Sequence, residues 1–335
     1  MILLTFGTRP EFIKIKPLID MFSKKGYPCK VLFTGQHTNL LPSGAGLLID
    51  YKLEMKNGPN RLDTIVSSLM NQSYIWVEGF EYVLVQGDTT SAFAMSLAAF
   101  HRKIKVLHLE AGLRTYDLDH PYPEEFNRQA ISRLASAHFC PTEIAANNLK
   151  NEMVDPKKIF ITGNTVLDNL VETRAKTGNK VLITMHRREN HELIPQWFKE
   201  MDSIAEAHPE LEFVFPIHPN PNVQKHKGVF KHVKVVDPLE YTDFIKELSQ
   251  CRLLISDSGG IQEEASFFKK RVVVCRKKTE RTEGLGIFFE LCQHPRDLRE
   301  LFEHLLDQPA ISPDTPSPFG DGTAALQIYN IVKEL

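Results

Sequence analysis

With 335 residues the chain can form two domains with ample core, although a single α/β domain would also fit. Its 40 basic and 42 acidic side chains nearly cancel, which argues against a general nucleic-acid-binding surface. No apolar run could span a bilayer, and the first, Ile2–Phe6, is too short for the core of a signal peptide. The five cysteines are scattered and never form a C-x-x-C pair, which predicts free thiols in a reducing compartment. We therefore expect a cytoplasmic protein.

Short apolar runs alternate with longer amphipathic stretches along the whole chain. This is the pattern of βα units around a parallel sheet, so it predicts an α/β fold. The expected strands are Ile2–Phe6, Lys30–Thr34, Tyr82–Gln86, Val106–Leu109, His138–Cys140, Ile159–Ile161, Val181–Thr184, Glu212–Pro216, Val233–Val236, Leu253–Ser256 and Arg271–Val274. Helical patterns between them include Ser91–Arg102, Glu124–Ser136 and Ile194–His208.

Polar residues and Gly178 interrupt this alternation around Asp168–Asn179. They predict a first domain over residues 1–168 and a second over 169–323. A proline-rich stretch, Gln308–Ser317, then reads as extended chain before an apolar-periodic segment, Ala324–Leu335. That segment predicts a terminal helix, packed either on its own domain or back on the first.

The first expected strand ends in the turn Gly7-Thr8-Arg9. Glycine permits a tight turn and a close approach of a ligand to the backbone. Arg9 could hold a phosphate with its planar fork, and Lys14 lies about one helical turn beyond it. The alternative is that both are ordinary surface cations on a first helix.

Three carboxylates follow expected strands or open an expected helix. Asp88 follows one strand in Gln-Gly-Asp-Thr-Thr, where it could be catalytic or a helix N-cap. Glu110 follows the next strand, and because glutamate is a poor cap it is a candidate acid or base. Glu124 and Glu125 open a helix, and one of them could serve only its dipole. If Asp88, Glu110 and Glu124 converge, crowding raises their pKa values and suits proton transfer.

In the second half, His186–Asn190 places cations after a strand, which suits a phosphate or a carboxylate. His218 lies in the rigid turn Pro216–Pro221, which favours a functional role. Neither histidine has the spacing of a zinc site, so no metal is expected.

The segment Asp257–Glu264 is the strongest local signal. Its two glycines expose backbone N–H groups at a helix start, which suits a phosphate. A glutamate one turn in could accept hydrogen bonds from ribose hydroxyls. The alternative is a glycine-rich turn with a capping Asp or Ser. Thr279–Gly284 follows the next strand and could line the same cleft.

Taken together, these motifs resemble the non-hydrolysing UDP-N-acetylglucosamine 2-epimerase family. The resemblance runs in order over nearly the whole chain, through GTRPEFIK, TGQH, GDTT, EAGLRT, PEEFNR, PTE, TGNTVLDNL, HRREN, HPNPNV, DSGGIQEEA, TERTEG and PFGDGTA. It implies two Rossmann-like domains of the glycosyltransferase B-type architecture, with the active site in the interdomain cleft.

The reaction that the resemblance implies is reversible epimerisation of UDP-N-acetylglucosamine to UDP-N-acetylmannosamine, without NAD or metal. The family mechanism is anti elimination of UDP to a 2-acetamidoglucal, followed by re-addition to the other face. It requires stabilisation of the leaving diphosphate and carboxylates on opposite faces of the sugar. The product would feed surface polysaccharide synthesis.

Carried over residue by residue, the resemblance implies acid–base roles for Asp88, Glu110 and Glu124, without saying which serves which face. It implies that His218 is catalytic and contacts the diphosphate. The residues that it implies for UDP-sugar binding are Arg9, Lys14, Ser258, Gly259, Gly260, Glu264 and Arg281. Gln36 and His37 mark the place where bacterial members have a second, regulatory substrate site.

Two segments depart from the family pattern. After His37 the chain has Thr38-Asn39-Leu40 and then Leu41–Leu48, where relatives carry an arginine and a methionine, so activation by substrate is in question. Beyond Gly284 the run Leu285–Phe289 is more apolar than in relatives and borders the sugar end of the site, which suggests a modified sugar.

Several alternatives stay open from the sequence. They are a C2 epimerase of a modified UDP-2-acetamido sugar, a hydrolysing 2-epimerase, a glycosyltransferase and a sugar-nucleotide sensor. The GTRPE segment favours the non-hydrolysing branch, and three carboxylates exceed what simple glycosyl transfer needs. The expected partners are a UDP-amino sugar, UDP and a second copy of the chain in a homodimer, with no nucleic acid or membrane.

Overall fold

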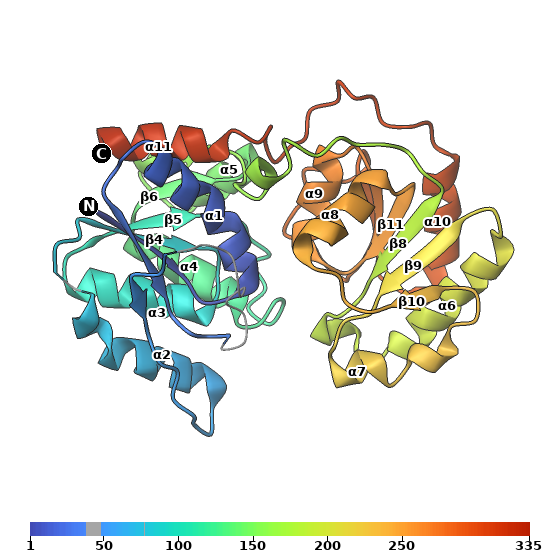
Figure 1. The fold of residues 1–335 in the computed structure, drawn as a ribbon, viewed down its shortest axis with the longest axis horizontal. Coiled ribbons are helices and arrows are strands. Elements are labelled where there is room, and N and C mark those ends of the chain that lie inside the picture. Colours follow the sequence, from blue (N-terminus) through green and yellow to red (C-terminus); the bar gives the residue numbers. More distant parts are fainter. Residues whose placement is uncertain (38–47, 77) are drawn as a thin grey trace. The chain divides into compact units, whose positions relative to one another are not determined.

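The computed structural model describes residues 1–37, 48–76 and 78–335. The chain forms two compact units, each with its own parallel sheet between layers of helices (Figure 1). Unit 1 comprises Met1–Asn169 together with Gly320–Leu335, and unit 2 comprises Leu170–Phe319. The chain therefore leaves unit 1 once and returns to it for its last residues.

The sheet of unit 1 has the strand order β3-β2-β1-β4-β5-β6-β7, and all its neighbours are parallel. The order reverses between β1 and β4, as in a dinucleotide-binding fold. The strands are β1 (Ile2–Phe6), β2 (Cys29–Phe33), β3 (Tyr51–Lys52), β4 (Tyr82–Gln86), β5 (Lys105–Leu109), β6 (Ala135–Cys140) and β7 (Ile159–Ile161). The α-helices are α1 (Arg9–Lys24), α2 (Arg61–Asn71), α3 (Thr90–His101), α4 (Glu124–Leu134), α5 (Glu143–Asn151) and α11 (Ala324–Glu334).

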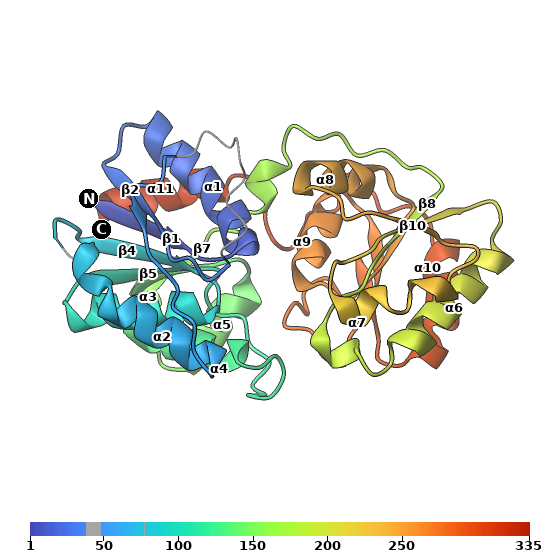
Figure 2. The same ribbon diagram turned by 60° about the horizontal axis from the view of Figure 1, so that its bottom comes forward.

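Both faces of this sheet are buried, which is why its strands are apolar throughout. One face packs on α1 and α11, where Phe22 contacts Tyr27 and Tyr329. The other packs on α2 and α3, as Figure 2 also shows. The N-terminus of α11 is tied to this unit because the Ala325 N–H donates to Asp168 at 2.9 Å. The terminal helix thus belongs to unit 1.

Unit 2 has the strand order β10-β9-β8-β11-β12-β13, again parallel, and it reverses between β8 and β11. Its strands are β8 (Lys180–Thr184), β9 (Glu212–Pro216), β10 (Lys234–Val236), β11 (Leu253–Ser256), β12 (Arg271–Cys275) and β13 (Phe289–Cys292). Its α-helices are α6 (Ile194–Ala207), α7 (Pro221–Gln224), α8 (Tyr241–Gln250), α9 (Gly259–Phe267) and α10 (Leu298–Asp307). A core of Trp197, Phe198, Phe215 and Phe302 joins α6 and α10 to one face of the sheet.

The predicted α/β fold is confirmed, and the two strand orders add the topology. Two short strands, β3 and β13, were not predicted. The helix predicted at Glu124–Ser136 ends at Leu134, because Ala135 and Ser136 already belong to β6, which pairs with β5. All five cysteines are free thiols. Within the described ranges, no helix has both the length and the apolar character needed to cross a membrane.

Candidate active site

The predicted site residues lie at the carboxyl ends of the strands in both sheets. In unit 1, β1 and β4 flank the point where the strand order reverses and lead to Arg9 and Asp88. In unit 2, β8 and β11 do the same and lead to His186 and Ser258. Because ligands of open α/β sheets bind at such points, each unit presents one candidate binding edge.

The turn after β1 is closed by its own side chains. Thr8 caps α1, and the Glu11 carboxylate accepts hydrogen bonds from the Gly7 and Thr8 N–H groups at 2.8 and 2.6 Å. Thr89, from the turn after β4, donates to the other Glu11 oxygen at 2.6 Å. Burial raises the pKa of Glu11. Glu11 thus joins the two loops at the reversal point and places Arg9 at the first turn of α1, a role that the sequence reading did not assign to it.

Glu110 directly follows β5 and lies in a left-handed backbone conformation, with φ of 62°. One of its carboxylate oxygens accepts hydrogen bonds from Lys14, from Gln86 at 3.0 Å and from Asn164 at 2.9 Å. Glu110 is only 9 % exposed, so these donors replace water around its charge. The strained backbone and three donors fix the carboxylate at the strand end. Gln86 and Asn164 belong to the quoted motifs but were not predicted as site residues.

Asp88 follows β4, and its carboxylate pairs with Arg128 on α4. Its backbone carbonyl accepts a hydrogen bond from Asn127 at 2.9 Å. The N-cap of α3 is Thr89, whose hydroxyl accepts from the Ala92 N–H, so the capping alternative for Asp88 is wrong. Asp88 and Glu110 thus lie at the ends of neighbouring strands, and a cation beside each offsets their mutual repulsion.

Two glutamates begin α4 and have different environments. Glu125 is fully buried and accepts from the N–H groups of Thr115 and Tyr116, both at 3.0 Å, so it holds the loop after Glu110 in place. Glu124 is only partly buried. It lies on the helix that also carries Arg128, one turn before it. The structure therefore gives Glu125 the structural role and leaves Glu124 as the candidate acid or base.

Gln36 and His37 lie against the same turn. The His37 N–H donates to the Gly7 carbonyl at 2.9 Å, and Gln36 accepts from the Ser91 N–H at 3.1 Å. Burial lowers the pKa of His37, which favours the neutral ring. The departure predicted after them, at Thr38–Leu48, lies almost wholly outside the described residues.

The turn after β11 is built differently, because no N-cap side chain accepts a hydrogen bond from the helix that follows it. Ser258 is the N-cap of α9, but its side chain makes no capping hydrogen bond. A Cβ on Gly259 would lie 2.8 Å from the end of the Arg281 side chain and 3.0 Å from that of Glu280, so a larger residue would displace this ion pair. At Gly260 a Cβ would meet no protein atom within 4 Å. The N-terminus of α9 therefore has no side-chain cap and has space beside Gly260, which suits an anion.

Asp257 is fully buried at the centre of this edge. Its carboxylate accepts from the N–H groups of His186 and Arg187, at 3.0 and 2.8 Å, and from the Asn190 side chain at 3.1 Å. Asn190 also donates to the Cys275 carbonyl at the end of β12 at 2.9 Å. Asp257 therefore fixes the cationic loop after β8 beside the N-terminus of α9.

His186 and His218 stack, with ring centroids 4.9 Å apart and an interplanar angle of 18°. Burial lowers the pKa of both rings. The Asn220 N–H donates to Nδ1 of His218 at 3.1 Å, so the neutral ring carries its proton on Nε2. His218 can thus donate one hydrogen bond from Nε2 to a ligand at this edge.

Glu264 and Arg281 are held by neighbouring side chains. Tyr241 donates to Glu264 at 2.8 Å, and burial keeps the pKa of Tyr241 far above its ordinary value. Arg281 pairs with Glu263 at 2.5 Å and with Glu280. Because two carboxylates already balance its charge, Arg281 supports the N-terminus of α9 more than it adds free positive charge.

The apolar run after Gly284 does not form one surface. Phe288 and Phe289 are each 1 % exposed, and a Cβ on Gly284 would lie 2.2 Å from the Phe289 ring. Leu285, Gly286 and Ile287 are exposed. The two phenylalanines of this departure are therefore core packing, so the sequence argument for a modified sugar rests on Leu285 and Ile287 alone. In the described part of the chain, no group of three His, Cys, Asp or Glu side chains could hold a metal ion.

The protein-family model described as UDP-N-acetylglucosamine 2-epimerase matches residues 21–333. The chain belongs to this family. It is 37 % identical to the UDP-N-acetylglucosamine 2-epimerase of Neisseria meningitidis serogroup A, over 97 % of this chain and 96 % of the relative.

Solved structures from the same family superpose along the whole chain. The crystal structure of the N. meningitidis UDP-GlcNAc 2-epimerase bound to UDP-GlcNAc has a TM-score of 0.90 and 36 % identity, and covers 100 % of both chains. The Methanocaldococcus jannaschii UDP-GlcNAc 2-epimerase in complex with UDP-GlcNAc and UDP has a TM-score of 0.82 and 28 % identity, covering 100 % of this chain and 99 % of that one. Family membership thus rests on sequence and structure together.

Proposed function

We propose that this protein is a non-hydrolysing UDP-N-acetylglucosamine 2-epimerase, which interconverts UDP-N-acetylglucosamine and UDP-N-acetylmannosamine. The observation that carries the proposal is the pair of carboxylates at neighbouring strand ends, Glu110 beside Lys14 and Asp88 beside Arg128. A cation beside a carboxylate favours its ionised form, which is the form that can accept a proton. The family relationship supplies the substrate.

The chemistry is an elimination followed by an addition. In the first step a carboxylate takes the C2 proton of the sugar, the C1–O bond to the diphosphate breaks, and UDP and a 2-acetamidoglucal form. In the second, UDP re-adds at C1 and C2 receives a proton on the opposite face. The net change is an isomerisation, so no oxidant, reductant or co-substrate is consumed. Two proton-transfer groups are needed, and Asp88, Glu110 and Glu124 provide three candidates.

We assign the stabilisation of the leaving diphosphate mainly to groups of unit 2. The N-terminus of α9, which the Ser258 side chain does not cap, offers the N–H groups of Gly259 and Gly260 and the positive end of the helix dipole, whereas the Ser258 N–H already donates to Ser256 at 3.0 Å. His218 adds a donor from Nε2, and Arg9 on unit 1 adds a guanidinium. Such preorganised donors matter because the C2 proton is weakly acidic, so the departing charge must be strongly stabilised. Glu264, one turn into α9, is assigned to the ribose.

The family resemblance also supports a homodimer that acts in the cytoplasm and supplies surface polysaccharide synthesis. The assembly state is testable by light scattering of the purified chain, where a monomer at every concentration would exclude the homodimer.

The experiment is proton NMR of the purified protein with UDP-N-acetylglucosamine in deuterated water. We expect UDP-N-acetylmannosamine signals to grow while the C2 proton is lost to solvent. Release of free N-acetylmannosamine and UDP would instead identify a hydrolysing enzyme. No reaction, with UDP binding intact, would overturn this substrate assignment in favour of a modified UDP-2-acetamido sugar.

A further inference from the structure

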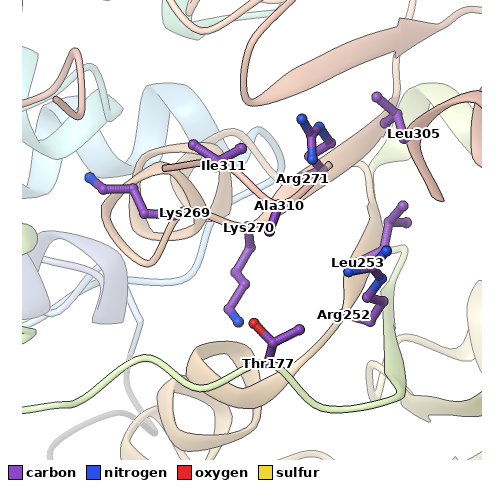
Figure 3. A pocket seen from close by; sticks show the side chains of 9 residues that line it. All are labelled: Thr177, Arg252, Leu253, Lys269, Lys270, Arg271, Leu305, Ala310 and Ile311. Atoms are coloured by element: carbon purple, nitrogen blue, oxygen red, sulfur yellow. The ribbon is translucent and has the colours of Figure 1, made fainter. Parts of the chain in front are cut away.

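The sheet of unit 2 has a second polar end, opposite its candidate binding edge. A pocket lies where β11 and β12 begin, and we call it the basic pocket after Arg252, Lys270 and Arg271, which line it with Thr177 (Figure 3). Arg252 directly precedes β11, and Asp257 directly follows it. Because the intervening strand is extended, the two ends lie roughly 16 Å apart. The basic pocket is therefore separate from the groups assigned to UDP.

Buried cations in the rest of the molecule are paired with carboxylates, as Arg114 is with Glu152 at 2.7 Å. Cations of the basic pocket donate only to backbone carbonyls. Arg252 donates to Leu306 at 3.1 Å, and Arg271 donates to Pro309 at 2.7 Å. Among the described residues, no carboxylate forms an ion pair with either arginine or with Lys270.

Lys270 is the most deeply buried of these cations. It is 4 % exposed, and its ammonium donates to the Lys176 carbonyl. Burial, with repulsion from Arg252 as a smaller cause, lowers the pKa of Lys270, and the same two causes lower that of Arg271. The buried Nε of Arg271 has no hydrogen-bond partner in the described structure. Clustered, uncompensated positive charge is costly unless an anion accompanies it.

Two cations of this cluster have a structural role, because they bind the end of α10. Arg252 and Arg271 hold the last carbonyls of that helix and the chain that follows, which suits the helix dipole. This role does not require Lys270, whose side chain points toward Thr177 in Figure 3. Lys269 points away from Lys270 and Thr177 in the same view, and its ammonium lies 6.0 Å from the centre of the Phe288 ring.

We propose that the basic pocket binds a small phosphate-type oxyanion through Arg252 and Lys270, while Arg271, whose side chain points away from Lys270 in Figure 3, adds positive charge at its rim. Guanidinium forks match two oxygens of such an anion, an ammonium adds a compact charge, and the Thr177 hydroxyl adds a neutral donor. The site would be occupied independently of UDP, because its residues lie at the other end of the strands.

The test is calorimetric titration of the full chain with inorganic phosphate, and separately with inorganic diphosphate, at low ionic strength and saturating UDP. Saturation with UDP fills the candidate active site first, so the remaining heat reports a second site. We expect about one equivalent of anion per chain, with tighter binding of whichever anion the pocket fits. If UDP itself were the occupant, UDP alone would bind at two equivalents per chain.

Variants locate the binding. We expect Lys270→Met, which keeps the length of the buried side chain, and Arg252→Met to weaken anion binding by about tenfold or more. Lys246→Met, at an exposed lysine on α8, is the matched control and should bind as the wild type does. Folding is checked by UDP affinity, which should be unchanged in all three. Absence of anion binding in the UDP-saturated wild type would overturn the proposal, as would wild-type affinity in folded Lys270→Met or Arg252→Met.

Discussion

Helices α1 and α9 each follow a strand beside the reversal point of a sheet, α1 after β1 and α9 after β11, but their N-termini are satisfied in different ways. At α1, Thr8 accepts a hydrogen bond from the Glu11 N–H, and the Glu11 carboxylate accepts from Gly7 and Thr8. At α9, Ser258 makes no such bond. The first terminus is satisfied from within, so an anion gains little from its backbone. The second leaves its N–H groups for a ligand.

The side chains around the two termini differ in the same sense. Unit 1 presents carboxylates at its strand ends, Glu110 with Lys14 and Asp88 with Arg128. Unit 2 uses its central carboxylate, Asp257, to hold backbone N–H groups. One topology thus carries two different arrangements of side chains, and the difference lies in which groups the local hydrogen bonds occupy. We infer that unit 1 carries the proton transfer and unit 2 the diphosphate.

The largest expected effect is on turnover, at Glu110. Glu110→Gln keeps the shape and can still meet Gln86 and Asn164, but an amide cannot take up the proton. We expect kcat to fall by about 10³-fold, with the Kd for UDP within about threefold of wild type because unit 2 is assigned the diphosphate. Initial-rate kinetics and calorimetry measure the two. Glu143→Gln, at an exposed glutamate of α5, is the control, and wild-type turnover in Glu110→Gln would remove Glu110 from the chemistry.

The converse variant is Gly259→Ala. Its new Cβ would lie 2.8 Å from the Arg281 guanidinium, so either that side chain, which pairs with Glu263 and Glu280, or the N-terminus of α9 must shift. We expect UDP to bind about 10- to 100-fold more weakly, as charge-assisted hydrogen bonds are lost. Gly228→Ala is the matched control, because a Cβ there meets no atom within 4 Å. UDP affinity equal in the two variants would show that α9 does not hold the diphosphate.

The capping difference itself can be measured by urea unfolding. Thr8→Ala removes a capping hydrogen bond and should lower the free energy of unfolding by about 1 kcal/mol. Ser258→Ala removes no cap, so we expect a change below about 0.5 kcal/mol, with its effect on UDP affinity instead. Equal losses of stability in both variants would contradict the contrast drawn between α1 and α9.

A smaller effect is expected at acidic pH, where two buried histidines of unit 1 make the free energy of unfolding depend on pH. Burial lowers the pKa of His108 to about 4 and that of His138 to about 3. Below the unfolded value of about 6.5, the unfolded chain binds protons that the folded chain does not, so stability falls as pH falls toward these values. Each histidine contributes a slope on the order of 1 kcal/mol per pH unit in that window.

Removing one of them should flatten this dependence. We expect His138→Leu to lose stability less steeply than wild type between pH 6 and pH 4, measured by unfolding at a series of pH values. His304→Gln, at an exposed histidine of α10, is the control. A wild-type slope in His138→Leu would show that His138 is protonated in the folded chain.

Several strands have the bounds that the sequence predicted, and in some of them a glycine or a charged residue ends the apolar run. Ile2–Phe6 and Tyr82–Gln86 have the predicted bounds because Gly7 and Gly87 stop the pattern. Where no such residue stands, pairing decides. Leu134 and Ala135 separate a helix from a strand without any breaker, so the end of α4 depends on β6 joining β5.

The candidate site also has residues that the sequence predicts and residues that only the fold reveals. Polar residues at strand ends, such as Asp88 and Glu110, could be predicted because each comes just after the apolar run of a strand. Their partners could not, because the fold brings them from far along the chain. Asn164 lies 54 residues from Glu110, and Arg128 lies 40 residues from Asp88. Cap assignments likewise depend on backbone geometry, which is why Thr89 and not Asp88 caps α3.

The most direct measurement is a crystal structure of the Glu110→Gln variant with UDP-N-acetylglucosamine bound. The account predicts diphosphate oxygens within hydrogen-bond distance of the Gly259 and Gly260 N–H groups. It also predicts the sugar C2 facing the side chains of residues 110 and 88. A diphosphate bound at the N-terminus of α1 instead, or a sugar turned away from both carboxylates, would contradict the division of work between the two units.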